Sequence, residues 1–191
     1  MTGPCGILLA AGRATRFGEP KLTQPLPDGT PIALAAANAI TAHLSRTIAV
    51  VRPDDRELAA LLRSAGMGIL PCPFADRGMG ASLAAAISHT RSAPGWIVAL
   101  GDMPYIRPGT VRTIRDRLVE GQSLVLPVHQ GRRGHPVGFG PEFGPDLEVL
   151  DGDIGARSIL ARHARPEHRL CVSDPGICRD IDTPADLCQA D

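Results

Sequence analysis

The sequence predicts an α/β fold, a single Rossmann-like, doubly wound domain over residues 1–191 with a mostly parallel central sheet and a β-excursion in its C-terminal half. Short apolar runs alternate with helical segments through the first 120 residues, which is typical of β-α-β units with helices on both faces of a sheet. After Gly121, two strand-like pieces instead flank the polar turn HQGRRGHP. Ligands of such sheets bind beyond the carboxyl ends of the parallel strands, where we expect the functional residues.

Local signals support each element. The first strand, at 5–11, is a continuous apolar run that stops at a glycine-rich loop. An aspartate cap and a glycine stop bound the helix at 54–65, proline opens the helix at 108–120, and Thr183-Pro184-x-Asp186 has capping-box spacing for a final helix. The other predicted helices are 32–44, 82–91 and 156–164, and the other predicted strands are Thr47–Val51, 67–70, Trp96–Leu100, 123–128, Val137–Phe139 and 169–172.

Composition excludes several classes of function. Lys+Arg and Asp+Glu are equal at 20 each, and aromatic residues make up only 3% of the chain, so a nucleic acid polymer is not an expected partner. No apolar run approaches the roughly 20 residues that span a bilayer, and the N-terminus lacks a basic signal region, so we expect no membrane partner and a cytoplasmic location. The 5 cysteines form no C-x-x-C pair and are expected to be reduced and structural.

A loop rich in glycine and cations follows the first strand. The segment LAAGRATRFGEPKL, at 9–22, combines glycines, which allow close approach of the backbone to a ligand, with Arg13, Arg16 and Lys21. The Walker A pattern and G-x-G-x-x-G are both absent from this loop, which sets aside two common phosphate-binding folds. We predict that these three cations bind a polyanion.

Three further motifs offer contacts to a metal or a nucleotide. In GDMP, Asp102 leaves the buried strand Trp96–Leu100, a place well suited to holding Mg²⁺ beside phosphate oxygens. In DIDTP, Asp182 is either a turn residue or a second metal ligand. The glycine loop GMGAS opens a helix, where Gly80 and Ser82 either bind a base or ribose or simply cap the helix.

Taken together, the motifs resemble a known family. The chain carries, in order, LAAG-x-x-x-RFG-x-x-KL, GMG-x-SL, GDMP, GHPVGF, GD-x-GAR and DIDTPADL. Over nearly its whole length it resembles the molybdenum-cofactor nucleotidylyltransferases of the sugar-nucleotidyltransferase-like superfamily. The resemblance implies binding of an NTP with Mg²⁺ and transfer of NMP to the terminal phosphate of molybdopterin, with release of pyrophosphate.

The resemblance also implies roles for single residues, and charge suggests how they act. An anionic phosphate acceptor needs no strong base; it needs cancelled repulsion and in-line placement. Arg16, Lys21 and Asp102 are therefore the expected catalytic residues. The implied nucleotide contacts are Leu9, Ala10, Ala11, Gly12, Arg13, Gly80 and Ser82, the implied acceptor contacts are Gly134, His135, Asp153 and Arg157, and the implied metal ligands are Asp102 and Asp182.

The expected donor is CTP. The chain resembles the cytidylyl branch in reading LAAG, where relatives that use GTP typically read LAGG, and the Ala11 methyl leaves less room for a purine. Transfer of GMP to molybdopterin, or of NMP to another small phosphate, remains open. So do an oxidoreductase-like relative in the same crevice and a non-enzymatic protein that delivers the finished cofactor to an apo-molybdoenzyme client.

Overall fold

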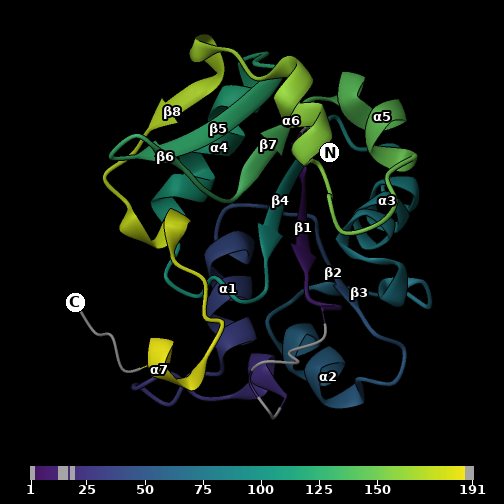
Figure 1. Cartoon of the computed structure of the whole chain (residues 1–191), viewed down its shortest axis with the longest axis vertical. Coiled ribbons are helices and arrows are strands. Elements are labelled where there is room, and N and C mark those ends of the chain that lie inside the picture. The colour runs from purple at the N-terminus through teal and green to yellow at the C-terminus, as the bar shows by residue number, and fades with distance from the viewer. Residues whose placement is uncertain (1–2, 13–16, 18–19, 188–191) are drawn as a thin grey trace.

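The computed structural model, which describes residues 3–12, 17 and 20–187, is built on one eight-stranded sheet (Figure 1). The strand order is β3-β2-β1-β4-β7-β5-β6, and β8 pairs with β5 outside this path. The strands are β1 (Cys5–Leu9), β2 (Thr47–Val51), β3 (Gly68–Pro71), β4 (Trp96–Leu100), β5 (Leu124–His129), β6 (Arg132–Arg133), β7 (Val137–Phe139) and β8 (Arg169–Cys171). This is the predicted α/β architecture.

The sheet changes direction at β7. Strands β3, β2, β1 and β4 are mutually parallel, whereas β7 runs antiparallel to both β4 and β5. Strands β5 and β6 form a hairpin whose two turn residues, Gln130 and Gly131, have φ of 48° and 80°, as a tight primed turn requires. The predicted β-excursion is therefore confirmed, and the parallel half presents four carboxyl ends at one edge.

Alternation along the strands fills a core on each face of the sheet. Ile7 and Val98 belong to one buried cluster, and Leu8 and Ile97 belong to the other, because successive side chains of a strand point to opposite faces. Helices α3 (Met79–His89), α5 (Gly144–Glu148) and α6 (Arg157–His163) cover the first cluster, and α1 (Ile32–Thr41), α2 (Arg56–Ser64) and α4 (Pro108–Val119) cover the second. The two layers match the doubly wound prediction.

Some boundaries differ from those predicted. The first strand ends at Leu9, although the Ala10 amide still donates to Val50 O at 2.9 Å. Helix α3 begins at Met79, three residues before the predicted start at Ser82, because Gly78 at φ 107° turns the chain into the helix there. Helix α5 was not predicted, since the run GPEFGPDL is rich in helix breakers.

After β8, the last part of the chain runs down the left of the view to α7 (Figure 1). The short helix η4 (Pro166–His168) precedes β8, and η5 (Pro175–Cys178) and α7 (Pro184–Leu187) follow it. The predicted capping pair is confirmed, because Asp186 Oδ2 accepts from the Thr183 amide at 2.7 Å and from its hydroxyl at 2.9 Å. Across the described residues, no helix is long and apolar enough to cross a membrane.

Candidate nucleotide and acceptor sites

One cavity, here called the first cavity, has a volume of about 670 Å³ and lies where the parallel strands end. Four consecutive strands in the sheet contribute to its wall through the residues that follow them. Its lining comprises Leu9, Ala10, Ala11, Gly12, Lys21, Leu22, Arg52, Ala75, Asp76, Gly78, Met79, Ser82, Leu100, Asp102, Asp153 and Asp182. The structure thus brings most of the predicted nucleotide and metal residues into one space.

One cation bridges the two predicted metal ligands. Lys21 Nζ lies 2.9 Å from Asp102 Oδ2 and 3.6 Å from Asp182 Oδ1. The Lys21 side chain is only 10% exposed, against 26% for Asp102 and 46% for Asp182. The three charges come from segments 80 or more residues apart along the chain, so the cluster is a product of the fold.

Backbone hydrogen bonds explain why the two carboxylates meet. The amide of Gly101 donates to Leu9 O at 2.9 Å, so Asp102 is fixed as the chain leaves β4. The amide of Ile181 donates to Asp102 O at 2.9 Å, which places Asp182 next in line. Asp182 is therefore held by the C-terminal segment and not by the sheet.

Asp174 anchors that segment and was missed by the sequence analysis. It is 2% exposed, and it accepts from the Thr110 hydroxyl at 2.6 Å, the Arg107 amide at 2.9 Å and the Gly176 amide at 3.0 Å. These bonds join the start of α4 to η5. A buried carboxylate with three donors is satisfied, so its role is to fix the chain that leads to Asp182.

The carboxylate pair fits a divalent metal. Asp102 Oδ1 is buried and has no hydrogen-bond partner among the described residues, so this oxygen is available to coordinate a metal ion. The described residues contain no group of three or more His, Cys, Asp or Glu side chains placed to hold a metal. Mg²⁺ commonly binds through one or two carboxylates plus substrate phosphates and water, and the two aspartates match that requirement.

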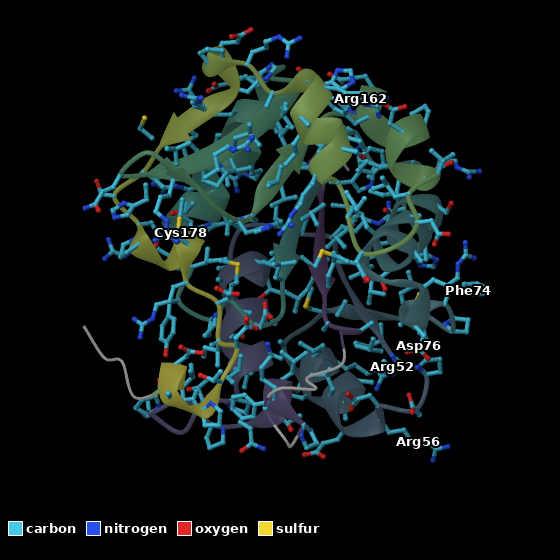
Figure 2. All side chains as sticks on the ribbon, in the orientation of Figure 1. Arg52, Arg56, Phe74, Asp76, Arg162 and Cys178 are labelled. Atoms are coloured by element: carbon cyan, nitrogen blue, oxygen red, sulfur yellow. The ribbon has the colours of Figure 1, made fainter. Side chains whose placement is uncertain are left out.

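An arginine and an aspartate at the opposite end of the cavity were also missed. Arg52 follows β2, and Asp76 lies in η2 (Ala75–Arg77) after β3. Arg52 Nη1 lies 2.9 Å from Asp76 Oδ1, and Nη2 donates to Oδ2 at 3.0 Å, so the pair is bidentate. Figure 2 labels the two residues close together. The rule that found Asp102, a charged residue directly after a buried strand, also marks Arg52, but the pairing partner depends on tertiary structure.

The glycine loop serves packing more than ligand contact. Gly80 does not line the cavity, and its amide donates to Gly152 O at 2.8 Å, so this N–H is not available to a base. A Cβ at Gly80 would lie 2.8 Å from Asp151 O, which forces glycine at this close approach. Ser82, two residues further along α3, does line the cavity.

A second cavity of about 400 Å³ adjoins the first. Leu9, Met79, Leu100 and Asp153 line both. All four predicted acceptor residues, Gly134, His135, Asp153 and Arg157, line the second cavity. Two spaces that share one wall suit a reaction between two bound molecules.

His135 is held firmly in this second cavity. Its amide donates to Ile177 O at 2.9 Å, and its Nδ1 atom is buried without a hydrogen-bond partner among the described groups. Burial lowers the pKa of His135, which outweighs the raising effect of a hydrogen bond to the Val98 backbone. The preceding Gly134 has no room for a side chain, because a Cβ there would collide with Ile177 O.

Two predicted residues fall outside the description. Arg13 and Arg16, between Gly12 and Phe17 in the sequence, lie outside the described residues, and their roles stay predictions. Gly12 is exposed, and Ala11 is 4% exposed, at the end of β1 in the first cavity.

Comparison with known proteins agrees with this geometry. The family profile described as MobA-like NTP transferase domain matches residues 6–167. The purine catabolism protein PucB of Bacillus subtilis is 26% identical over 189 residues, covering 94% of this chain and 91% of that protein. A probable molybdenum cofactor guanylyltransferase of Natronomonas pharaonis is 27% identical over 196 residues, covering 95% of this chain and 94% of that protein.

A solved structure is also similar to this chain in its three-dimensional fold. The structure of Rv0371c from Mycobacterium tuberculosis H37Rv in complex with manganese is similar to this chain with a TM-score of 0.79 and 26% identity, covering 97% of this chain and 96% of that one. A relative with the same fold thus binds a divalent ion in its crystal, which agrees with the donor set around Asp102.

Proposed function

The chain belongs to the family of MobA-like NTP transferase domains, and from that premise we propose that it transfers CMP from CTP to the terminal phosphate of molybdopterin. The observation that carries the proposal is the shared wall between the first and second cavities, formed by Leu9, Met79, Leu100 and Asp153. It brings a nucleotide in one cavity and a phosphate monoester in the other to a common border.

The reaction exchanges one phosphoanhydride for another. An oxygen of the acceptor phosphate attacks the α-phosphorus of CTP, the bond from that phosphorus to the β-phosphate bridging oxygen breaks, and pyrophosphate leaves with the bond electrons. The acceptor is already an anion, so no general base is required.

Charge neutralisation is the main task of the residues in the first cavity. The Lys21 ammonium is positioned to donate to phosphate oxygens and to offset the negative charge of the leaving pyrophosphate. Asp102, with Asp182, would hold the divalent metal, whose chemistry is to polarise phosphate oxygens and orient the triphosphate. Arg157 lines the second cavity, where its charge favours an anionic acceptor.

The order of the strands in the sheet suggests how the nucleotide is oriented in the first cavity. Asp102 follows β4, whereas Arg52 and Asp76 follow β2 and β3 on the other side of β1. Adjacent strands are about 4.8 Å apart, so the carboxylates and the Arg52–Asp76 pair are separated by roughly 10 Å or more. We assign the phosphates to the Asp102 end and the base to the Arg52–Asp76 end.

A second candidate is GMP transfer from GTP, favoured by the relative from Natronomonas pharaonis, which is named a guanylyltransferase. The edges of cytosine and guanine both combine donors and acceptors, so the Arg52–Asp76 pair can serve either base. Ala11 supports CTP, because its methyl group at the end of β1 reduces the space beside the base.

The experiment is competition between CTP and GTP at equal concentration for molybdopterin with Mg²⁺, with the dinucleotide products separated by chromatography and pyrophosphate measured in parallel. We expect the cytosine dinucleotide to predominate. A guanine product would replace the CTP assignment, and no pyrophosphate with either nucleotide would contradict molybdopterin as the acceptor.

A further inference from the structure

A third cavity, of about 330 Å³, continues from the second. Leu126, Arg133 and Leu160 line both. The third cavity lies among β5, β8, α6 and η4, and the rest of its lining comprises Ala161, Ala164, Arg165, Pro166 and Arg169. The three cavities therefore follow one another, with the second in the middle.

The charge of the lining residues changes along this path. The first cavity has four aspartates against Lys21 and Arg52. The second is more balanced, with Asp153 and Asp180 facing three arginines. The third has three arginines and no acidic residue. For a molecule that spans the second and third cavities, the lining is therefore more positive at the end in the third cavity.

The three arginines of the third cavity have no acidic partner in the described structure. Arg133, Arg165 and Arg169 form no ion pair with a described carboxylate. Arg165 is fixed in place, since its Nη1 donates to the carbonyls of Arg162 at 3.0 Å and Ala164 at 3.1 Å. All three side chains are exposed, so water partly screens the repulsion among their charges, and an anion bound between them would offset what remains.

A comparable cavity elsewhere lacks these properties. Arg52, Arg56 and Arg63 line a space of about 340 Å³ beside α2, but Asp55 is also in its lining and Arg52 is paired with Asp76. That cavity adjoins no part of the second one. Of these two cavities, only the one on the acceptor side has arginines in its lining and no acidic residue.

We propose that the third cavity binds a second anionic oxygen group of the acceptor, at the end remote from the phosphate that receives the nucleotide. The inference rests on the proposed acceptor site and adds, beside the reacting phosphate, a contact to a second anionic group of the same acceptor. The wall shared by the first two cavities includes Leu100 of β4, and the wall shared by the last two includes Leu126 of β5. Since β7 lies between these strands, the two anions are separated by roughly 10 Å, two inter-strand spacings.

The acceptor's two ends have different tasks. The phosphate at the first border reacts, whereas the distal anion contacts only Arg133, Arg165 and Arg169 and stays unchanged. Charge-assisted hydrogen bonds from arginine to an oxyanion are directional and strong, so the distal contact would also set the orientation of the acceptor. Arg165 and Arg169 are positioning residues in this proposal, because they lie away from the reacting atoms.

Calorimetry with simple probes tests the proposal. Alkyl monophosphates and α,ω-alkane bisphosphates of increasing linker length are titrated into the full chain at low salt, and their dissociation constants are compared at each length. For the wild type we expect one optimal length at which the second phosphate tightens binding about tenfold, which corresponds to ~1.4 kcal/mol.

The matched variants are R165Q/R169Q and the control R56Q/R63Q, which removes two exposed arginines beside α2. The gain from the second phosphate should disappear in R165Q/R169Q, with monophosphate affinity unchanged, and should persist in the control. R169Q alone, which leaves the Arg165 carbonyl contacts intact, should lose part of the gain and guards against misfolding of the double variant.

Several outcomes would overturn the proposal. They are the absence of any gain in the wild type at every linker length, a gain that survives R165Q/R169Q, and an equal loss in R56Q/R63Q. The probes contain neither nucleotide nor molybdopterin, so failure of the transfer assay would reject the proposed function without altering this result. Conversely, successful transfer with no bisphosphate gain would reject the distal anion site alone.

Discussion

Lys21 Nζ lies 2.9 Å from Asp102 Oδ2, so the main candidate metal ligand is paired with a lysine in the described structure. The same ammonium lies 3.6 Å from Asp182 Oδ1. A cation between two carboxylates competes with a divalent metal for the same negative charge. Entry of a triphosphate would offer Lys21 alternative anionic partners, so metal and nucleotide are expected to bind together more readily than the metal alone.

Replacing Asp102 by asparagine should abolish metal binding and turnover. D102N keeps the shape of the side chain and removes its charge, so we expect Mn²⁺ affinity, measured by electron paramagnetic resonance with CTP present, to fall by at least about tenfold. We expect kcat/KM to fall by about 100-fold or more, which is ~2.7 kcal/mol of transition-state stabilisation. D146N, at a surface carboxylate of α5, is the control. Full activity of D102N would end the metal assignment.

Replacing Lys21 by methionine should separate its two effects. Without the ammonium, Mn²⁺ should bind the free protein more tightly than it binds wild type, because Asp102 and Asp182 lose their internal cation. At the same time kcat/KM for CTP should fall at least about tenfold, since phosphate charge is no longer neutralised. Resonance titrations without nucleotide and steady-state kinetics measure the two effects. Weaker Mn²⁺ binding in K21M would contradict competition between lysine and metal.

Base selectivity should depend on both ends of the base region. A11G removes one methyl group, which is usually worth about 1–3 kcal/mol in a pocket, so the CTP preference should narrow without reversing. D76N replaces one acceptor oxygen by a donor and should raise KM for CTP with little change in the dependence on the acceptor. Product ratios from CTP and GTP competition measure the first change, and separate KM values measure the second. Unchanged ratios and KM values in both variants would place the base elsewhere.

His135, whose Nδ1 atom is buried, predicts a pH dependence of stability. Burial lowers the pKa of His135 in the folded chain below that of the unfolded chain, so between these two values the unfolded state binds more protons. Asp102 and Asp180 oppose this shift, and Arg157 reinforces it. Stability should therefore decrease as the pH falls through about 6.5 toward the folded pKa.

Urea unfolding of H135Q across this pH range provides the measurement for that prediction. H135Q should lose part of the pH dependence, whereas H89Q, at an exposed position of α3, should retain it. Identical slopes for wild type and H135Q would show that other groups cause the effect.

The sequence predicts the residues at the strand ends well, but it predicts poorly which residues from distant parts of the chain form hydrogen bonds with each other. Asp102 was found because a charged residue after a continuous apolar strand is a local pattern, and Thr47–Val51 and Trp96–Leu100 have the predicted bounds. Gly80 was predicted either to bind a base or ribose or to cap the helix, and its amide instead donates to Gly152 O, 72 residues further along the chain. Such a partner depends on how loops dock, a nonlocal property that periodicity and spacing do not encode.

Asp174 is a second residue whose role could not be predicted from the sequence. A single aspartate before Pro175 reads as a turn residue, yet it is buried and joins α4 to η5. Its donors include Arg107 and Thr110, more than sixty residues earlier in the chain. Residues of this kind become visible only when the tertiary fold brings their donors together.

The hydrogen bond from the Ile181 amide to Asp102 O has a consequence for the order in which the site is assembled. Seven of the eight strands lie within the first 139 residues, so a nascent chain can form most of the sheet, and the Lys21–Asp102 pair, early in synthesis. Asp182 joins Lys21 and Asp102 only after the ribosome has released the C-terminal segment that β8 and Asp174 hold in place. A growing chain therefore passes through a stage in which Lys21 and Asp102 are already paired and Asp182 is not yet beside them.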